Sequence, residues 1–312
     1  MDMQYTDGER YYSFPAYCRN TFGHKLYKVP LDAGMTCPNR DGTLGRRGCI
    51  FCDEGGSGDF ALAYHGQPIR REMLKGERYP EELTGLCIGY FQAYTNTYAP
   101  VDKLDCLFRA ALQEPLFAGI SIATRPDCMP NEVMELLRQL KADYPDKFIW
   151  VELGLQSIHE RSARWMRRGY ELPVFDDCVR RLRELEIPVI VHVILGLPQE
   201  TEEDMLATVA HLNRCGAAGV KLQLLHYLRG TDLGEMYLRG EVQALSEDEY
   251  IRILGSCIAA LDPGIVIHRL TGDGPGDLLL APLWSRDKKR VLNRLRADLR
   301  ERKITQGCRG LL

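Results

Sequence analysis

Short, almost continuously apolar runs alternate with amphipathic stretches between residues 24 and 245. Strands that are apolar on both faces are typical of a buried parallel sheet, and strand–helix alternation implies right-handed crossovers. The pattern therefore predicts an α/β fold, either a partial barrel or an open doubly wound sheet. The expected strands cover residues 24–29, 86–91, 119–124, 148–155, 188–195 and 219–227. The expected helices cover residues 101–113, 131–142, 158–167, 173–186 and 202–215.

The pattern changes in the last seventy or so residues, where we expect a C-terminal α/β extension (246–312) packed on a core (1–245). Ser246 is a predicted helix cap, because acidic side chains fill the turn that follows it. The predicted elements are a helix over 246–261, a strand over 264–270, a turn-forming loop over 271–277 and a basic helix over 286–303. The last of these carries nine Lys or Arg against three acids.

Composition is that of an ordinary globular protein. Of the 312 residues 45% are hydrophobic and 27% charged, which excludes a disordered chain, a collagen-like fibre and a small disulfide-stapled scaffold. No apolar stretch is long enough to cross a bilayer, so we expect no membrane partner. The first residues lack the basic and apolar regions of a signal peptide, which predicts a cytoplasmic protein. A net charge of −3 imposes no strongly charged partner on the chain as a whole.

Eleven cysteines in a reducing compartment are expected to be thiols rather than disulfides. Four lie in helical patterns and are expected to act as small core residues: Cys106, Cys178, Cys215 and Cys257.

The segment 35–56 is different, because Cys37, Cys49 and Cys52 have the spacing C-x11-C-x2-C. A structural zinc site closes with four ligands, and His65 is only a weak candidate for the fourth. A four-iron cluster held by three cysteines leaves one iron open for an amine and a carboxylate. The spacing favours such a cluster and leaves a zinc knuckle as the alternative. The loop follows the first strand, so it lies at the mouth where barrel active sites are built.

Motifs along nearly the whole chain resemble those of the radical S-adenosylmethionine (SAM) enzymes. More narrowly, the chain resembles the YhcC/YtqA-type group, which is akin to the radical core of the Elongator catalytic subunit. The resemblance implies a partial (β/α)6 TIM-like barrel, a [4Fe–4S] cluster and S-adenosyl-L-methionine. It rests on CPNRDGTLGRRGCIFC (37–52), YFQAYTNTYAP (90–100), SIATRPDCMP (121–130), VELGLQS (151–157), MRRGY (166–170), VHVILGLPQET (191–201), VKLQLLHYLRGTDL (220–233) and HRLTGDGP (268–275).

The resemblance also implies roles for single residues. Cys37, Cys49 and Cys52 would ligate the cluster, and Phe51 would place its backbone near the adenine. Arg168 would suit the cofactor carboxylate, because a guanidinium offers two parallel hydrogen bonds. The remaining residues expected around the cofactor are Gln92, Thr95, Asn96, Glu152, Gln156 and His192.

The resemblance implies a tRNA substrate for the radical chemistry. The group is associated with the wobble uridine, where 5-carboxymethylaminomethyluridine becomes 5-aminomethyluridine. Partners would be an external one-electron donor of the flavodoxin or ferredoxin type and a downstream methyltransferase. Candidate substrate-side residues are Arg125, Lys221, His226 and Arg269.

Other interpretations remain open at this stage. The basic helix either contacts phosphates or is a solvated amphipathic helix whose Val291, Leu292 and Leu295 pack inward. Trp284, Tyr94 or Tyr98 would be available to stack on a splayed base. Arg125 alternatively forms a structural salt bridge with Asp127. Two further functions compete: a radical enzyme acting on a small metabolite or a protein, and a non-enzymatic metal or cysteine module.

Overall fold

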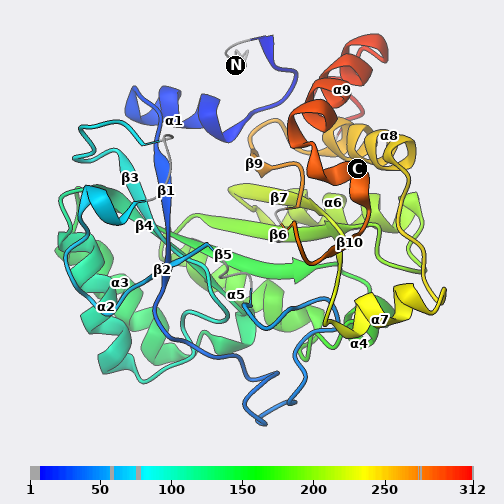
Figure 1. Cartoon of the computed structure of the whole chain (residues 1–312). Helices are drawn as coiled ribbons and strands as arrows, with labels where there is room; N and C mark the ends of the chain where they lie inside the picture. Colours follow the sequence, from blue (N-terminus) through cyan, green and yellow to red (C-terminus); the bar gives the residue numbers. More distant parts are fainter. Residues whose placement is uncertain (1–7, 57–59, 75–78, 273, 275, 311–312) are drawn as a thin grey trace.

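The fold is built on one eight-stranded sheet in which all neighbours are parallel (Figure 1). The computed structural model describes residues 8–56, 60–74, 79–272, 274 and 276–310. The strand order is β2-β1-β3-β4-β5-β6-β7-β9, and no pairing joins β2 to β9 in the described part of the chain. The sheet is therefore a partial barrel. Its strands are β1 (Tyr27–Asp32), β2 (Leu62–Ala63), β3 (Cys87–Phe91), β4 (Phe117–Thr124), β5 (Phe148–Gln156), β6 (Val189–Leu195), β7 (Gly219–Leu224) and β9 (Val266–Arg269).

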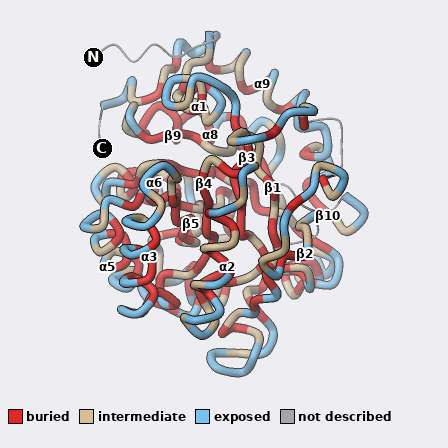
Figure 2. The backbone as a smooth tube through the Cα atoms, turned by 90° about the vertical axis from the view of Figure 1, so that its left-hand side faces the viewer, coloured by how far each residue is buried: buried red, intermediate tan, exposed pale blue. Residues whose placement is uncertain are grey.

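Helices that connect the strands cover the outer face of the sheet. In α2, Leu104, Leu107, Phe108 and Ala111 form the buried face, as 3.6-residue spacing requires. Figure 2 shows the resulting buried layer between sheet and helices. The helices are α1 (Phe14–Phe22), α2 (Val101–Gln113), α3 (Asn131–Asp143), α4 (Glu160–Trp165), α5 (Leu172–Glu184), α6 (Glu202–Cys215), α7 (Asp232–Leu238), α8 (Glu247–Ala260) and α9 (Lys288–Glu301).

The predicted fold class is confirmed, and all six predicted core strands are present. They are β1 and β3 to β7, although β1 begins three residues later than the expected 24–29. The short strand β2, helix α1 and helix α7 were not predicted. A two-stranded antiparallel sheet of β8 (Tyr227–Leu228) and β10 (Leu279–Ala281) was also missed. These elements are too short to show a clear period in the sequence.

The C-terminal segment is joined to the core through the sheet itself. Strand β9 pairs with β7, and α8 packs against α6 and α9. Ser246 caps α8 in a reciprocal capping box with Glu249, as the sequence predicts. The predicted loop 271–277 includes Asp273 and Pro275, which lie outside the described residues. The expected division at residue 245 stays a prediction.

Helix α9 is amphipathic and anchored on its apolar side. Val291, Leu295 and Leu299 are buried, and Leu292 packs half-buried against the same core. On the polar side, Arg290 and Arg294 form ion pairs with Glu247 at the start of α8.

One of the four helical cysteines corrects the sequence expectation. Cys178 and Cys257 are buried and Cys215 is half-buried, but Cys106 is exposed. Cys106 lies between Leu104 and Leu107 in sequence, at an angle that turns it away from the buried face of α2. In the described residues no helix has the length and apolar character needed to cross a membrane.

The packing of α9 gives a stability prediction. Replacing Leu295, which is fully buried, with Ala should lower the free energy of unfolding by about 2–5 kcal/mol, because it leaves a cavity between α8 and α9. The same change at half-buried Leu292 should cost clearly less. Urea unfolding of the two variants is the measurement, and equal losses would contradict the packing described here.

Candidate functional site

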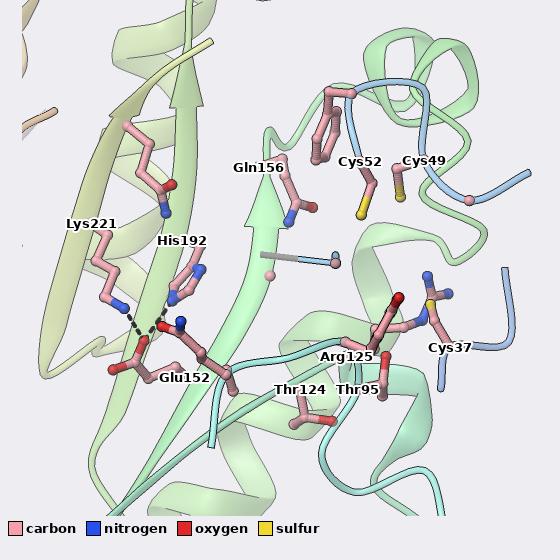
Figure 3. A pocket seen from close by; sticks show the side chains of 18 of the residues that line it. Cys37, Cys49, Cys52, Thr95, Thr124, Arg125, Glu152, Gln156, His192 and Lys221 are labelled. Atoms are coloured by element: carbon pink, nitrogen blue, oxygen red, sulfur yellow. Dashed lines mark hydrogen bonds and ion pairs between the residues drawn. The ribbon is translucent and has the colours of Figure 1, made fainter. Parts of the chain in front are cut away.

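A cavity of about 540 Å³ opens at the carboxyl ends of the central strands, within the range of small-ligand sites. Its lining residues come from the inner face of the sheet and from the loop after β1 (Figure 3). The three motif cysteines lie on one side, and Glu152, His192 and Lys221 lie on the opposite side. The cavity therefore has two chemically different ends.

The cysteine end is formed by the loop between β1 and β2. Cys37, Cys49 and Cys52 all line the cavity and are free thiols. Asn39 ties the loop to the segment after α4, since its amide Nδ2 donates to the Arg167 carbonyl at 2.7 Å and lies 3.4 Å from Cys49 Sγ. Burial raises the pKa of Cys52 to about 12 and also raises that of Cys49. Each of these thiols must therefore release its proton when its sulfur becomes a metal ligand.

Residues 8–56 and the other described parts of the chain hold no set of three His, Cys, Asp or Glu side chains arranged around a single metal ion. The three cysteines instead share one wall of a larger cavity.

Most of the residues expected around a cofactor border this cavity. Phe51, Gln92, Thr95 and Gln156 line it. Gln156 ends β5 with a left-handed φ of 62°, and the β5–β6 register shifts beside it. Asn96 is not part of the lining: it is fully buried, and its amide Nδ2 donates to the Ala123 carbonyl at 2.9 Å. Its Oδ1 has no hydrogen-bond partner.

Arg168 lines the cavity, but nearly all of its guanidinium is engaged. It is 2% exposed and donates to the carbonyls of Leu155, Ser157 and Tyr170 at 2.7–3.1 Å. A longer contact of 3.3 Å reaches Glu160. These bonds favour a role in holding the backbone on both sides of Gln156, and the cofactor-binding role stays a prediction.

Glu152 forms the centre of the opposite end. Its carboxylate is fully buried and accepts four hydrogen bonds. Lys28 Nζ at 3.1 Å and Ser121 Oγ at 2.9 Å donate to Oε1, while His192 Nε2 at 2.7 Å and Lys221 Nζ donate to Oε2. Complete burial alone would raise the pKa of Glu152, but the charges of Lys221 and Lys28 and the bond from His192 hold that pKa well below its usual value.

His192 is held as a neutral ring in one tautomer. Burial and the nearby charge of Lys221 lower the pKa of His192 to about 4. Because the ionised Glu152 accepts at Oε2, the proton of the neutral ring is on Nε2. Nδ1 is then left as an acceptor, and Figure 3 shows this nitrogen on the cavity side of the ring. From the sequence, His192 is expected around the cofactor, and that contact stays a prediction.

The four substrate-side candidates divide between two cavities. Arg125, Lys221 and Arg269 line the main cavity. Arg125 also forms a two-pronged salt bridge with Asp127 at 2.7–2.9 Å, the structural alternative that the sequence left open. His226 lies in an adjoining cavity of about 350 Å³, with its Nε2 3.3 Å from Ser285 Oγ.

The aromatic candidates for base stacking are already in contact with the protein. Trp284 packs 5.5 Å from Tyr250, and its indole N–H donates to the Leu245 carbonyl. Tyr94 lines the main cavity with Arg40 over its ring, and Tyr98 bonds to Thr43.

Sequence reasoning missed Lys28, Tyr90, Gln223 and Lys288, which also line the main cavity. The sequence held a signal for Gln223 and Lys28. Gln223 is two residues from the candidate Lys221 in an otherwise apolar strand, so the two side chains point to the same face. Lys28 shows the same polar interruption in β1.

Comparison with known families agrees with this geometry. The Radical SAM superfamily model matches residues 42–212, more than half of the chain, and the radical SAM C-terminal domain model matches residues 217–301. The chain belongs to the radical SAM superfamily. Its cofactors are a [4Fe–4S] cluster and S-adenosylmethionine.

Three relatives show which radical SAM proteins this chain is similar to. The uncharacterized protein YtqA of Bacillus subtilis is 39% identical over 96% of this chain and 92% of its own length. Protein YhcC of Escherichia coli is 31% identical over 86% of this chain and 85% of its own length. Elongator complex protein 3 of Schizosaccharomyces pombe is 25% identical over 93% of this chain, which spans 63% of that protein.

A solved structure of the archaeal Methanocaldococcus infernus Elp3 supports the fold. It superimposes with a TM-score of 0.60 over 70% of this chain and 55% of that one, at 16% identity.

The residues of the cavity fit the family's cofactors. Three thiols on one wall supply the ligand type that iron–sulfur clusters require. Amide and hydroxyl groups of Gln92, Thr95 and Gln156 border the space beside them, where they can hydrogen-bond an amino acid or nucleoside group. The assignment of Cys37, Cys49 and Cys52 as ligands is carried into the proposal below.

The Glu152 network gives a prediction about stability. Glu152→Gln should lower the free energy of unfolding by about 3–5 kcal/mol, because it leaves two lysines beside a neutral amide in a buried site. Chemical denaturation measures the change. The same substitution at exposed, ion-paired Glu135 is the control and should have little effect. A small loss at Glu152 would show that its charge is not needed for the packing of the sheet.

The His192 environment gives a prediction about pH. The folded-state pKa of about 4 lies below the unfolded value of about 6.5, so the unfolded chain binds the proton first. The stability linked to His192 should therefore be lost as pH falls from about 6.5 to 4. His192→Gln keeps an N–H donor but cannot titrate, so its unfolding free energy should fall less over this range than that of the wild type. Half-buried His226 and His268 also have lowered pKa values and act in the same direction, so the dependence of stability on pH is reduced rather than removed.

A control separates this effect from surface titration. His24→Gln changes an exposed histidine and should leave the dependence of stability on pH as in the wild type. An unchanged slope in His192→Gln would contradict the neutral state assigned to His192.

Proposed function

We propose that this radical SAM enzyme modifies tRNA at the wobble uridine side chain and converts 5-carboxymethylaminomethyluridine to 5-aminomethyluridine. Cys37, Cys49 and Cys52 hold the cluster in this proposal. When bound, the cluster and S-adenosylmethionine supply a 5′-deoxyadenosyl radical, and the protein supplies binding and orientation. The resemblance to the YhcC/YtqA-type group and to Elongator complex protein 3 favours this substrate.

The observation that carries the proposal is the charge of the cavity. Among the described residues, seven Lys or Arg side chains line it, and Glu152 is the one acid. Such a cavity favours an anionic ligand, and the substrate proposed here ends in a carboxylate. A tRNA also brings phosphates to the entrance of the cavity.

The basic helix α9 is suitably placed for those phosphates. Its first residue, Lys288, lines the main cavity, so the helix begins at the site itself. Its apolar side packs on the core while Lys288 and Lys289 are exposed. The two interpretations of this helix from the sequence are therefore compatible, because packing and phosphate contact use different sides.

The uridine must leave its base stack for its side chain to enter a cavity of this size. The proposed conversion breaks the bond between the side-chain nitrogen and the carboxymethyl carbon. That carbon is oxidised by two electrons and leaves as glyoxylate with oxygen from water. The electrons end on S-adenosylmethionine, which is consumed as methionine and 5′-deoxyadenosine.

Two partners follow from this proposal. A one-electron donor of the flavodoxin or ferredoxin type would reduce the cluster. The 5-aminomethyl product carries a free amine, which a downstream methyltransferase would use.

The test is nucleoside mass spectrometry of total tRNA from cells with and without the gene. Loss of the gene should raise 5-carboxymethylaminomethyluridine and deplete 5-aminomethyluridine and its methylated products. Cells that express Cys37→Ala should match the deletion, because a cluster ligand is missing. Cys106→Ala changes an exposed cysteine on α2, so its expression in the deletion strain should restore the wild-type tRNA nucleoside profile.

An unchanged tRNA profile in the deletion would refute the proposed substrate. The purified enzyme then distinguishes the other candidate, since a radical enzyme acting on a metabolite or a protein still cleaves S-adenosylmethionine reductively. Cys37→Ala, Cys49→Ala and Cys52→Ala should each abolish that cleavage, and activity in any one would remove that residue from the ligand set.

A further inference from the structure

In the described part of the chain, the end of the cavity opposite the cysteines, here called the floor, has more basic than acidic side chains. It consists of Lys28, Glu152, His192, Lys221 and Arg269, which lie on the inner sides of β1, β5, β6, β7 and β9. Lys28 and Lys221 both form ion pairs with the same carboxylate, that of Glu152. One carboxylate neutralises one ammonium. Burial lowers the pKa of Lys221, although Glu152 raises it, so a second anion beside the two lysines would stabilise the charged form of Lys221; none is present among the described residues that line the cavity.

Glu152 itself is not available to a ligand. A carboxylate has about four acceptor positions, and Glu152 receives four hydrogen bonds from Lys28, Ser121, His192 and Lys221. The side chain is also fully buried. Glu152 therefore fixes the positions of the two lysine Nζ atoms rather than binding substrate.

The cations nearer the cysteines have their own acceptors. Arg125 pairs with Asp127, and Arg168 contacts Glu160 and three backbone carbonyls. Arg40 donates to the carbonyls of Cys52 and Asp53. The two lysines that share one carboxylate thus lie at the floor, where Arg269 is the partner of Lys221 in the β7–β9 register.

A buried positive charge is costly unless an anion accompanies it. The lysine Nζ groups can meet an anion within the cavity, because Lys28 and Lys221 both line it although Lys221 is only 2% exposed. The methionyl carboxylate of the cofactor is a poor candidate, because the three cysteines that would hold the cluster, and with it that carboxylate, lie at the other end of the cavity. The floor therefore suits an anionic group of the substrate.

We propose that the floor is a carboxylate-binding site in which Lys28, Lys221 and Arg269 bind the terminal carboxylate of the substrate side chain, with Glu152 as the positioning residue. This inference rests on the proposed function, because the carboxymethylaminomethyl group supplies that carboxylate. It also explains selectivity: the 5-aminomethyl product lacks the carboxylate and leaves the floor without its anion.

The test measures binding without turnover. N-methylglycine reproduces the end of the substrate side chain, and its amide has the same shape without the charge. Saturation-transfer NMR titration of the reconstituted holoenzyme should show a preference for the carboxylate of roughly tenfold or more, as expected for charge-assisted hydrogen bonds. Lys221→Met and Lys28→Met should each remove most of this preference, and both should retain the wild-type affinity for S-adenosylmethionine.

Controls keep the result decisive. Lys103→Met removes an exposed lysine on α2 and should keep the full preference. Circular dichroism and the cluster absorbance show whether each variant is folded and loaded. If Lys221→Met does not fold, Lys28→Met decides the question, since this residue is partly exposed and loses only one of the four bonds to Glu152.

Three results would overturn the inference. The wild type could bind N-methylglycine and its amide equally, or Lys28→Met and Lys221→Met could keep the preference for the carboxylate. The third is that these variants lose as much affinity for S-adenosylmethionine as they lose for N-methylglycine. The outcome is separate from that of the proposed function. A carboxylate preference with an unchanged tRNA profile keeps the floor site and refutes the tRNA substrate. An altered tRNA profile without the preference keeps the function and refutes the site.

Discussion

The cavity depends on the buried carboxylate of Glu152. A charged group in the middle of a sheet strand is tolerated only if its lost hydration is replaced, and here four donors from β1, β4, β6 and β7 replace it. These bonds connect the inner faces of five strands at one depth. Apolar side chains of similar volume would often be at least as stable. Stability alone therefore does not account for a carboxylate here, whereas the positioning of two lysines and a neutral histidine does.

At the cysteine end of the cavity, hydrogen bonds to the backbone hold the end of β5 and the cysteine loop in place. Gln156 has a backbone conformation that L-residues rarely adopt, and such strain persists only where the surroundings enforce it. Arg168 enforces it by donating to the carbonyls of Leu155 and Ser157, the residues on either side. The cysteine loop is tied to the neighbouring segment by Asn39. Asn39 donates to the Arg167 carbonyl and Arg168 donates to the end of β5, so the loop and the strand end are held through two adjacent residues.

The sequence was sufficient where a pattern is long and local. Six core strands, the capped helix α8 and the basic helix α9 follow from periodicity and end signals that need no tertiary information. The shared wall of the three cysteines follows from the loop's position after the first strand. The expectation that Cys106 lies in the core is wrong, because it rests on residue type rather than on the spacing from Leu104 and Leu107, which places Cys106 off the buried face of α2.

Contacts between residues far apart in the sequence could not be predicted from it. Nothing local in β1 indicates that Lys28 meets Glu152, which is 124 positions away. Arg168 could be placed near the site by its motif, but the carbonyls that occupy its donors depend on the turn after β5. Asn96 belongs to a segment that borders the cavity, yet its side chain is turned to Ala123. Side-chain direction at a loop is a tertiary property, and a motif does not contain it.

The C-terminal segment is part of the site rather than an appendage to it. Strand β9 extends the sheet beside β7 and places Arg269 at the floor, while the start of α9 places Lys288 in the lining. The match to the C-terminal family domain begins at residue 217, so it includes β7 and Lys221 as well. Glu152 and His192 come from the region matched by the superfamily core, and Lys221 and Arg269 come from the C-terminal one. Glu152 accepts hydrogen bonds from His192 and Lys221, and Arg269 lies beside Lys221 in the sheet, so both matched regions line the same cavity.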